Sequence, residues 1–159
     1  MTDSSNNKRM DSASKIINAS QQTIYNAFIN PEALVSWLPP KGMEGHIHEF
    51  DARNGGVYRM SLTYLDPNHI TKGKTSERAD VVEGRFLEFI PNKQIVQLVK
   101  FETDDSAYAG EMIMTWTLTA EAIGTKVSIV CENVPEGIRK EDHDAGLKST
   151  LENLALYTE

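Results

Sequence analysis

The sequence is short of cysteine, of positive charge and of long apolar runs, and each shortage excludes a class of protein. Its one cysteine, Cys131, rules out an internal disulfide and fits a reducing compartment. Sixteen Lys and Arg residues against 23 Asp and Glu residues give a net charge of -7, which argues against nucleic-acid binding because that binding needs clustered cations. No run approaches the ~20 apolar residues of a membrane-spanning helix. We therefore expect neither a nucleic-acid partner nor membrane insertion.

The start of the chain also lacks apolar residues. MTDSSNNKRMDS has no periodicity and no apolar core of a signal peptide, which predicts a disordered tail at residues 1–12 and a cytoplasmic protein. Residues 13–159 are long enough to bury one core, and 40% apolar with 25% charged residues is ordinary for a globular chain. We expect a single domain there.

Proline is scarce, and its placement predicts two short helices near the start. Three of the six prolines lie in PEALVSWLPP at residues 31–40. Before it, SASKIINA (12–19) predicts a strand, and Ser20 suits the N-cap of a helix over QQTIYNAFIN. Asn30-Pro31 ends that helix and begins a second one, which the two later prolines stop. The apolar side of the second helix carries Trp37.

After Gly42 the apolar residues recur with a period of two, which indicates strands. Six are expected, separated by turn residues such as Asn54-Gly55-Gly56 and by a polar loop at 67–78: residues 45–56, 57–66, 79–90, 94–103, 111–120 and 125–134. Three strands show a clear inner face: Tyr58, Met60, Leu62 and Tyr64; then Met112, Met114, Trp116 and Leu118; then Val127, Ile129 and Cys131. Residues 79–90 carry apolar side chains on both faces, so their inner face stays open.

The end of the chain, about residues 138–157, predicts one long helix. Leu147, Leu151 and Leu154 form an apolar stripe at helical spacing. Consecutive strands with short turns make an antiparallel meander, and one apolar-striped helix can cover one face of it. The expected fold class is therefore α+β, an antiparallel sheet of about six to seven strands wrapped around the C-terminal helix, with two short helices after the first strand.

Motifs that would identify an enzyme or a metal site are lacking. Lys72-Gly73-Lys74-Thr75 resembles the end of a phosphate-binding loop, but Asn68 stands where the earlier glycine is needed. His46 and His48 point the same way on a strand, yet the sequence offers no clear third ligand. We expect no metal and no other cofactor.

His143, in the segment EDHDAG, is the titratable residue with the most interesting position. It lies one turn before Leu147 on the apolar stripe, so its imidazole could reach the interior and act on a ligand as donor, acid or base. The alternative, which we favour, is a histidine that bonds backbone or its aspartate neighbours at the helix entrance. Glu83, Arg85 and Glu88 could equally face the interior or solvent.

The ordered set of segments resembles a known family. PEALVSWLPP, GHIHEFDARNGGVYRMSL, GRFLEFIPNKQIVQL, MTWTLTA with GTKVSIV, and a terminal H-x-x-G followed by a leucine helix are similar to the START-like SRPBCC superfamily. The nearest branch is homologous to the C-terminal domain of the activator of the heat-shock protein 90 ATPase. The resemblance covers about residues 13–157. It implies the helix-grip fold with a cavity between sheet and C-terminal helix. Members of the branch commonly carry tryptophan where this chain has Leu147, which implies a larger cavity here.

Two functions of different classes follow from these observations. The first is binding of a small hydrophobic molecule in the cavity, without catalysis, with Trp37 closing it opposite the C-terminal helix. The expected lining is Trp37, Met60, Leu62, Tyr64, Phe101, Met112, Met114, Trp116, His143 and Leu147. The second is a cyclase- or hydrolase-like enzyme on the same cavity with His143 as acid or base. Regulation of a chaperone ATPase is a third possibility that rests on the resemblance alone, and a homodimer is also possible.

Overall fold

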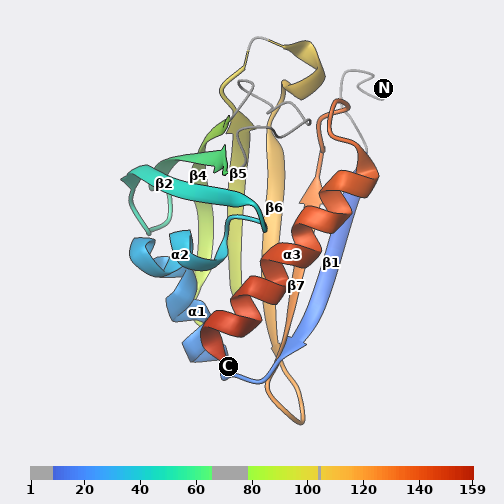
Figure 1. Cartoon of the computed structure of the whole chain (residues 1–159). Coiled ribbons are helices and arrows are strands. Elements are labelled where there is room, and N and C mark those ends of the chain that lie inside the picture. The colour runs from blue at the N-terminus through green and yellow to red at the C-terminus, as the bar shows by residue number, and fades with distance from the viewer. Residues whose placement is uncertain (1–8, 66–78, 104) are drawn as a thin grey trace, which may run out of the picture.

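A computed structural model describes residues 9–65, 79–103 and 105–159 of the chain (Figure 1). Its elements follow the expected order: β1 (Met10–Ile17), α1 (Gln21–Ile29), α2 (Pro31–Trp37), β2 (Met43–Phe50), β3 (Val57–Tyr64), β4 (Ala79–Ile90), β5 (Gln94–Phe101), the 3₁₀ turn η1 (Ser106–Tyr108), β6 (Met112–Ala120), β7 (Thr125–Glu132) and α3 (Lys140–Thr158). The expected loop at 67–78, with its Lys72-Gly73-Lys74-Thr75 motif, lies outside the described residues.

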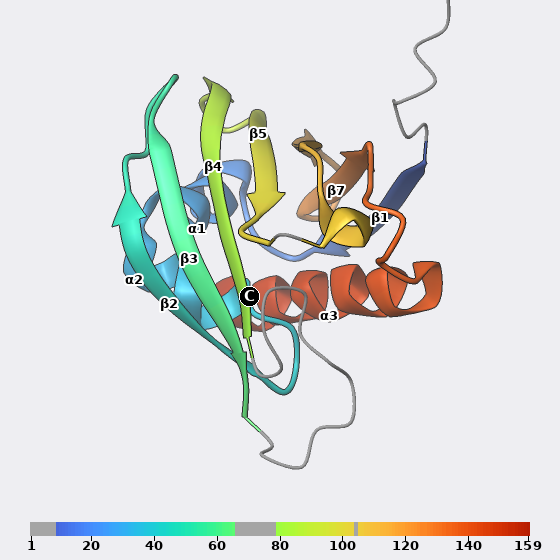
Figure 2. The same ribbon diagram turned by 90° about the horizontal axis from the view of Figure 1, so that it is seen from above.

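The seven strands form one antiparallel sheet in the order β1-β7-β6-β5-β4-β3-β2. Strands β2 to β7 pair in succession, and β1 joins the sheet beside β7. The sheet curves, and α3 crosses its concave side with α1 and α2 (Figures 1 and 2). The helix-grip α+β fold that the sequence predicts is confirmed. Among the described residues, no helix has the length and apolar character needed to cross a membrane.

Strand β1 begins at Met10, two residues before the strand start that the sequence suggested. It pairs with β7 without interruption from Met10 opposite Glu132 to Ile17 opposite Thr125. Residues 10–12 therefore belong to the sheet. The alternation along β1 points Asp11 to the concave side, where its side chain is only 1% exposed.

The PEALVSWLPP segment is capped at its start and tied to α3 at its end. The Asn30 side chain accepts hydrogen bonds from the backbone N–H groups of Glu32, at 2.9 Å, and Ala33, at 3.4 Å, so Asn30 both ends α1 and caps α2. After α2, Thr150 of α3 donates to the Leu38 carbonyl at 3.0 Å. A second donor from α3, the Asn153 amide, reaches the Pro39 carbonyl at 2.9 Å. The short helix is thereby fixed against the long one.

The inner face of β4 changes parity along the strand, which explains why apolar residues occupy both parities in its sequence. The pairing with β5 shifts between Phe86 and Glu88, the sign of a β-bulge. Before the shift, Val82 and Phe86 are buried at 7% and 2% exposure, and after it Phe89 packs against the core. Glu83, Arg85 and Glu88 consequently lie on the convex face, where Glu83 pairs with Lys100 at 3.0 Å.

Candidate functional site

The concave face of the sheet, opposite α3, gathers the residues that the sequence assigns to a cavity. Cross-strand pairing places Met60, Val82 and Phe101 in one row, and Met114 beside Gln97 and Cys131 in another. Five members of the set are almost fully buried: Trp37, Met60, Met112, Trp116 and Leu147. Five are only partly buried: Leu62, Tyr64, Phe101, Met114 and His143. The set thus divides into a packed part and a more open part.

The packed part contains both tryptophans. The ring of Phe28 contacts those of Trp37 and Trp116 edge-on, with centroid separations of 4.8 and 4.9 Å. The indole N–H of Trp37 donates to the Ala27 carbonyl at 2.9 Å, and that of Trp116 to the Gln97 side chain at 2.9 Å. Each ring is fixed by packing and by one hydrogen bond, so this end of the interior is a rigid aromatic wall.

The open part lies near the start of α3 and carries a tyrosine hydroxyl. Burial, with further contributions from Asp80, Asp142 and Tyr108, raises the pKa of Tyr64 to about 12. The Tyr64 hydroxyl is therefore uncharged at neutral pH, and it can both donate and accept hydrogen bonds. The buried carboxylate of Asp80, 2% exposed, lies on the same concave face of β4.

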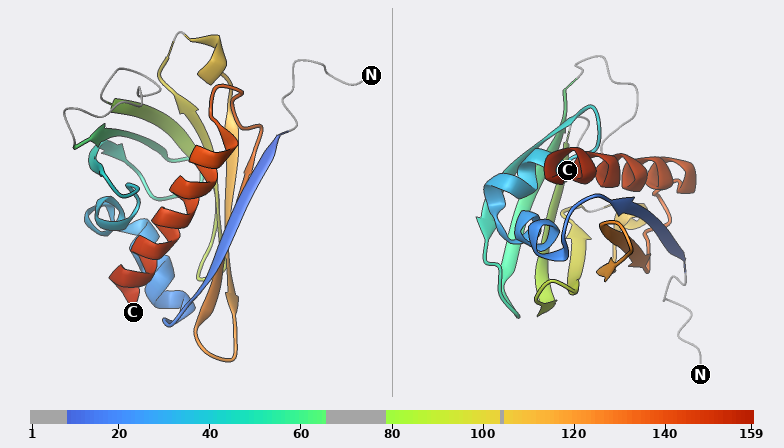
Figure 3. Two further views of the ribbon diagram at one scale, coloured as in Figure 1. Left: turned by 45° about the vertical axis from the view of Figure 1, so that its right-hand side comes forward. Right: turned by 90° about the horizontal axis from the view of Figure 1, so that it is seen from below.

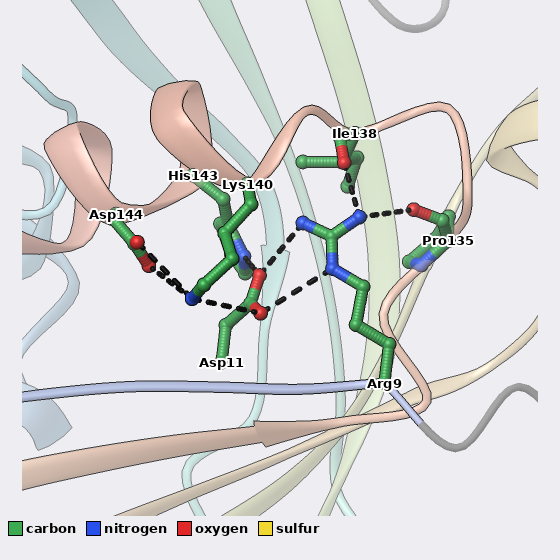
Figure 4. A network of polar contacts seen from close by, with 7 residues as sticks. All are labelled: Arg9, Asp11, Pro135, Ile138, Lys140, His143 and Asp144. Carbon is green, nitrogen blue, oxygen red and sulfur yellow. Dashed lines mark hydrogen bonds and ion pairs between the residues drawn. The ribbon is translucent and has the colours of Figure 1, made fainter.

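A polar network ties β1 to the start of α3 (Figure 4). The His143 Nδ1 atom lies 2.6 Å from Oδ2 of Asp11. The Arg9 guanidinium donates to the same carboxylate, from Nη2 at 2.8 Å and from Nε at 3.3 Å, and also donates to the carbonyls of Ile138 and Pro135. Lys140 bridges Asp11 and Asp144 at 3.7 and 3.1 Å. One buried carboxylate therefore gathers three basic side chains.

The basic partners of Asp11 stabilise the ionised form of its carboxyl group. Burial alone would raise the pKa of Asp11, but hydrogen bonds and charges from Arg9 and His143 outweigh it and lower that pKa to about 2. Because the carboxylate is ionised at neutral pH, it accepts the hydrogen bond and Nδ1 of His143 donates it. His143 was expected to bond backbone or its aspartate neighbours at the helix entrance, and the structure adds a partner from a distant strand, Asp11 of β1.

Sequence reasoning missed Asp11 and Arg9 as members of this network, because both fall in the segment interpreted as a tail. The alternation of the strand extended to Met10 would have placed Asp11 on the same face as Ala13 and Ile17. A lone carboxylate on the buried face of an edge strand would then have indicated a basic partner.

The two histidines of β2 are not part of this site. His46 and His48 are exposed, their rings meet edge-on at 5.0 Å, and His48 Nε2 lies 2.7 Å from the Ser61 hydroxyl. Within residues 9–65, 79–103 and 105–159, no three His, Cys, Asp or Glu side chains gather in a way that could hold a metal ion.

Two surface hollows accompany the site. One, of about 360 Å³, lies between β1 and α3; the other, of about 370 Å³, is lined by β4, β5 and the η1–β6 segment. Of the residues expected to line a cavity, Phe101 lines the second hollow.

The fold and the concave site place this chain in a class of proteins, the START-like helix-grip proteins of the SRPBCC type. The chain belongs to the family of activator of Hsp90 ATPase homolog 1-like proteins, whose model matches residues 18–159. This membership supports a binding protein of ligand-binding or co-chaperone type.

Solved structures agree with the family assignment. A crystal structure of a protein from Chromobacterium violaceum is 32% identical, has a TM-score of 0.83, and covers 94% of this chain and 96% of its own. A solution structure from Arthrobacter aurescens, 14% identical with a TM-score of 0.77, covers 94% and 85%. A crystal structure from Rhodobacter sphaeroides, 18% identical with a TM-score of 0.72, covers 92% and 89%. The last two show the fold alone. No curated protein matches the chain.

Proposed function

We propose that the protein binds a small, mainly apolar molecule between the concave face of the sheet and α3. The observation that carries the proposal is that Leu62, Tyr64, Phe101 and Met114 face the interior yet keep part of their surface accessible. Apolar side chains that point inward without being fully covered gain free energy when a ligand covers them, at about 25 cal/mol per Å² of apolar surface removed from water.

The chemistry of these residues suits such a ligand. Methionine side chains adapt their shape at little cost, so Met114 can accommodate ligands of varied outline. The uncharged Tyr64 hydroxyl supplies one polar contact that can orient a carbonyl or hydroxyl group. The rigid tryptophan wall at the other end limits how deep the ligand reaches. The family resemblance adds that Leu147 stands where related proteins commonly carry tryptophan, and a smaller side chain there favours a larger cavity.

Titration with 1-anilinonaphthalene-8-sulfonate, followed by probe emission and tryptophan fluorescence, tests the proposal. Met114→Trp fills the open part and is expected to weaken probe binding about tenfold or more. Ile113→Trp, on the adjacent convex-facing position of β6, is the matched control and leaves binding unchanged. Equal losses in both variants, or no binding by the wild-type protein, would contradict the proposal. Native mass spectrometry of protein purified from its own host identifies the natural ligand.

The contact between His143 and Asp11 favours an enzyme on the same cavity as the second candidate. Because Nδ1 bonds the carboxylate, a proton exchange between His143 and a substrate would have to involve Nε2. Against this role, the same carboxylate is shared with Arg9 and Lys140, as in a structural tie. The Cys131 thiol offers no nucleophile, because burial raises its pKa to about 12. Turnover of a bound ligand that His143→Gln abolishes without loss of binding would favour the enzyme.

A further inference from the structure

Strand β1 forms one free edge of the sheet. It stands first in the strand order, and no element of the described chain lies beyond it (Figures 1 and 3). Its eight residues pair with β7 without a bulge, so the backbone groups on the other side of β1 form a regular row that another strand can pair with.

Two common protections of a sheet edge, proline and a bulge, are missing from β1. Edge strands also carry charged residues that hinder pairing with another chain, and the two charges of β1, Asp11 and Lys15, both lie on its concave face. The convex face of β1 instead carries only uncharged residues: Met10, Ser12, Ser14 and Ile16. Its two ends are apolar and open to solvent, with Met10 60% and Ile16 57% exposed. This combination is typical of a strand that has a partner.

We propose that β1 pairs antiparallel with β1 of a second copy of this chain, about a two-fold axis at Ala13. In this register Met10 lies opposite Ile16 of the partner subunit, and the two-fold axis repeats the contact. Ser12 faces the partner's Ser14, and Asp11 faces the partner's Lys15, so no like charges meet. The two apolar side chains that each copy exposes at this edge are then covered by each other.

Met10 and Ile16 also select the register in which the two β1 strands pair. A shift by one residue in each strand, keeping the two-fold axis, places Met10 opposite the partner's Ser14 in one direction or the partner's Asn18 in the other. Either shift leaves both apolar ends of β1 facing polar residues. The pairing about Ala13 is therefore the one in which sequence and symmetry agree.

The surface beside the edge can accept a second copy. The hollow of about 360 Å³ between β1 and α3 is lined on the strand side by residues 12–15. Its α3 side carries both charge signs, with Lys148 between Asp144 and Glu152 along the helix. Because this surface of α3 carries both positive and negative side chains, the same surface of a second copy can approach it with its lysines near carboxylates. Because only one strand of each copy pairs, the interface belongs to the small class, below about 1,200 Å² in total, whose complexes are weak.

Sedimentation velocity of the full chain, from about 5 to 500 μM because small interfaces bind weakly, tests the pairing. The wild-type protein is expected to pass from monomer to dimer. Met10→Glu and Ile16→Lys each weaken the dimer tenfold or more, because a charge then faces an apolar side chain twice. The double variant restores it, because the new carboxylate and the new ammonium group face each other across the axis. Leu87→Lys, on the exposed part of β4, is the control and changes nothing.

Each result bears directly on the proposal. A wild-type chain that stays monomeric over the whole concentration range overturns self-pairing. The partner of the β1 edge would then be an extended segment of a different protein. A dimer that neither single variant weakens lies on another surface. A double variant that stays as weak as its parents excludes the register about Ala13. Thermal unfolding of every variant shows whether the monomer fold is intact.

Disulfide cross-linking between introduced cysteines gives a second measurement of the pairing. Cys131, the only native cysteine, is fully buried, so it does not compete with an introduced cysteine for disulfide formation. Ala13→Cys brings two thiols together at the axis and gives a disulfide-linked dimer under air oxidation. Ser14→Cys, whose partner position is Ser12, gives far less. Equal cross-linking of the two variants contradicts the register.

Discussion

His143 on α3 and Asp11 on β1 are 132 residues apart in the chain, and their side chains meet at 2.6 Å. This contact joins the first strand of the sheet to the start of the last helix. It does so at the end of the concave face that carries the partly exposed candidate residues. The network around Asp11 therefore sets how α3 lies across the sheet there, and the shape of the site depends on it.

Asp11→Ala is expected to lower the free energy of unfolding by about 3 kcal/mol, because it leaves Arg9, His143 and Lys140 around an empty position. Urea unfolding at pH 7 measures the loss. Asp144→Ala is the matched control, since Asp144 meets the same Lys140 at an exposed position and its removal costs less than about 1 kcal/mol. Similar losses in the two variants would show that Asp11 is not the centre of the network.

The lowered pKa of Asp11 predicts an acid-dependent loss of stability. Because the pKa is about 2 in the folded protein and near 3.8 in the unfolded chain, the unfolded state binds more protons between these values. The contribution of Asp11 is complete above about pH 4 and is lost as the pH falls through about 2, roughly 2 kcal/mol in all. Unfolding of the wild-type protein and of Asp11→Asn, measured from pH 5 to about 2, separates this effect from that of other carboxylates. Parallel curves would contradict the assignment.

The sequence was sufficient where a local pattern decides the structure. Alternation identified the buried faces of β3, β6 and β7, as Trp116 and Ile129 illustrate with 2% and 0% exposure. Ser20, Asn30 and Pro31 placed the boundaries of the two short helices, because capping and proline chemistry act within a few residues.

Other features depend on contacts between distant segments, and local patterns do not encode them. The bulge between Phe86 and Glu88 is a property of the pairing with β5, so the face of β4 could not be assigned from its own residues. Asp11 is buried because three basic groups from before and after the sheet converge on it. The open and packed parts of the concave face arise in the same way, from how α3 and α2 meet the sheet.

Cys131 is expected to be inert in the folded protein. Its thiol is fully buried, and burial together with the nearby Asp11 carboxylate raises its pKa to about 12. A thiol-specific colorimetric reagent at pH 8 should react fully in denaturant and only at the rate of unfolding without it. Fast reaction of the native protein would show that β7 opens locally at this position.

Substitution by alanine is expected to change the free energy of unfolding in opposite directions at Gly84 and at Gly146. A Cβ atom on Gly84 of β4 would lie 2.1 Å from the Leu98 carbonyl oxygen and 2.6 Å from the Tyr58 hydroxyl oxygen. The backbone of β5 must then move, so Gly84→Ala should destabilise the protein by about 3 kcal/mol or more. On Gly146 in α3 the nearest such neighbour is the Pro40 ring at 4.0 Å. Gly146→Ala should stabilise by about 0.5 to 1 kcal/mol, because alanine favours the helix.

Thermal unfolding of these two variants also tests how closely α3 and the PEALVSWLPP segment approach. A methyl group on Gly146 fits only if the Pro40 ring stays in place in solution, because that ring lies 4.0 Å from the position that the new Cβ atom would take. A destabilised Gly146→Ala would mean that α3 packs more closely against the PEALVSWLPP segment than the 4.0 Å distance indicates. Less room would then remain beside Leu147 for a ligand. A stabilised variant that still binds the fluorescent probe would show that this part of α3 is a fixed wall of the site, which a ligand meets without displacing the helix.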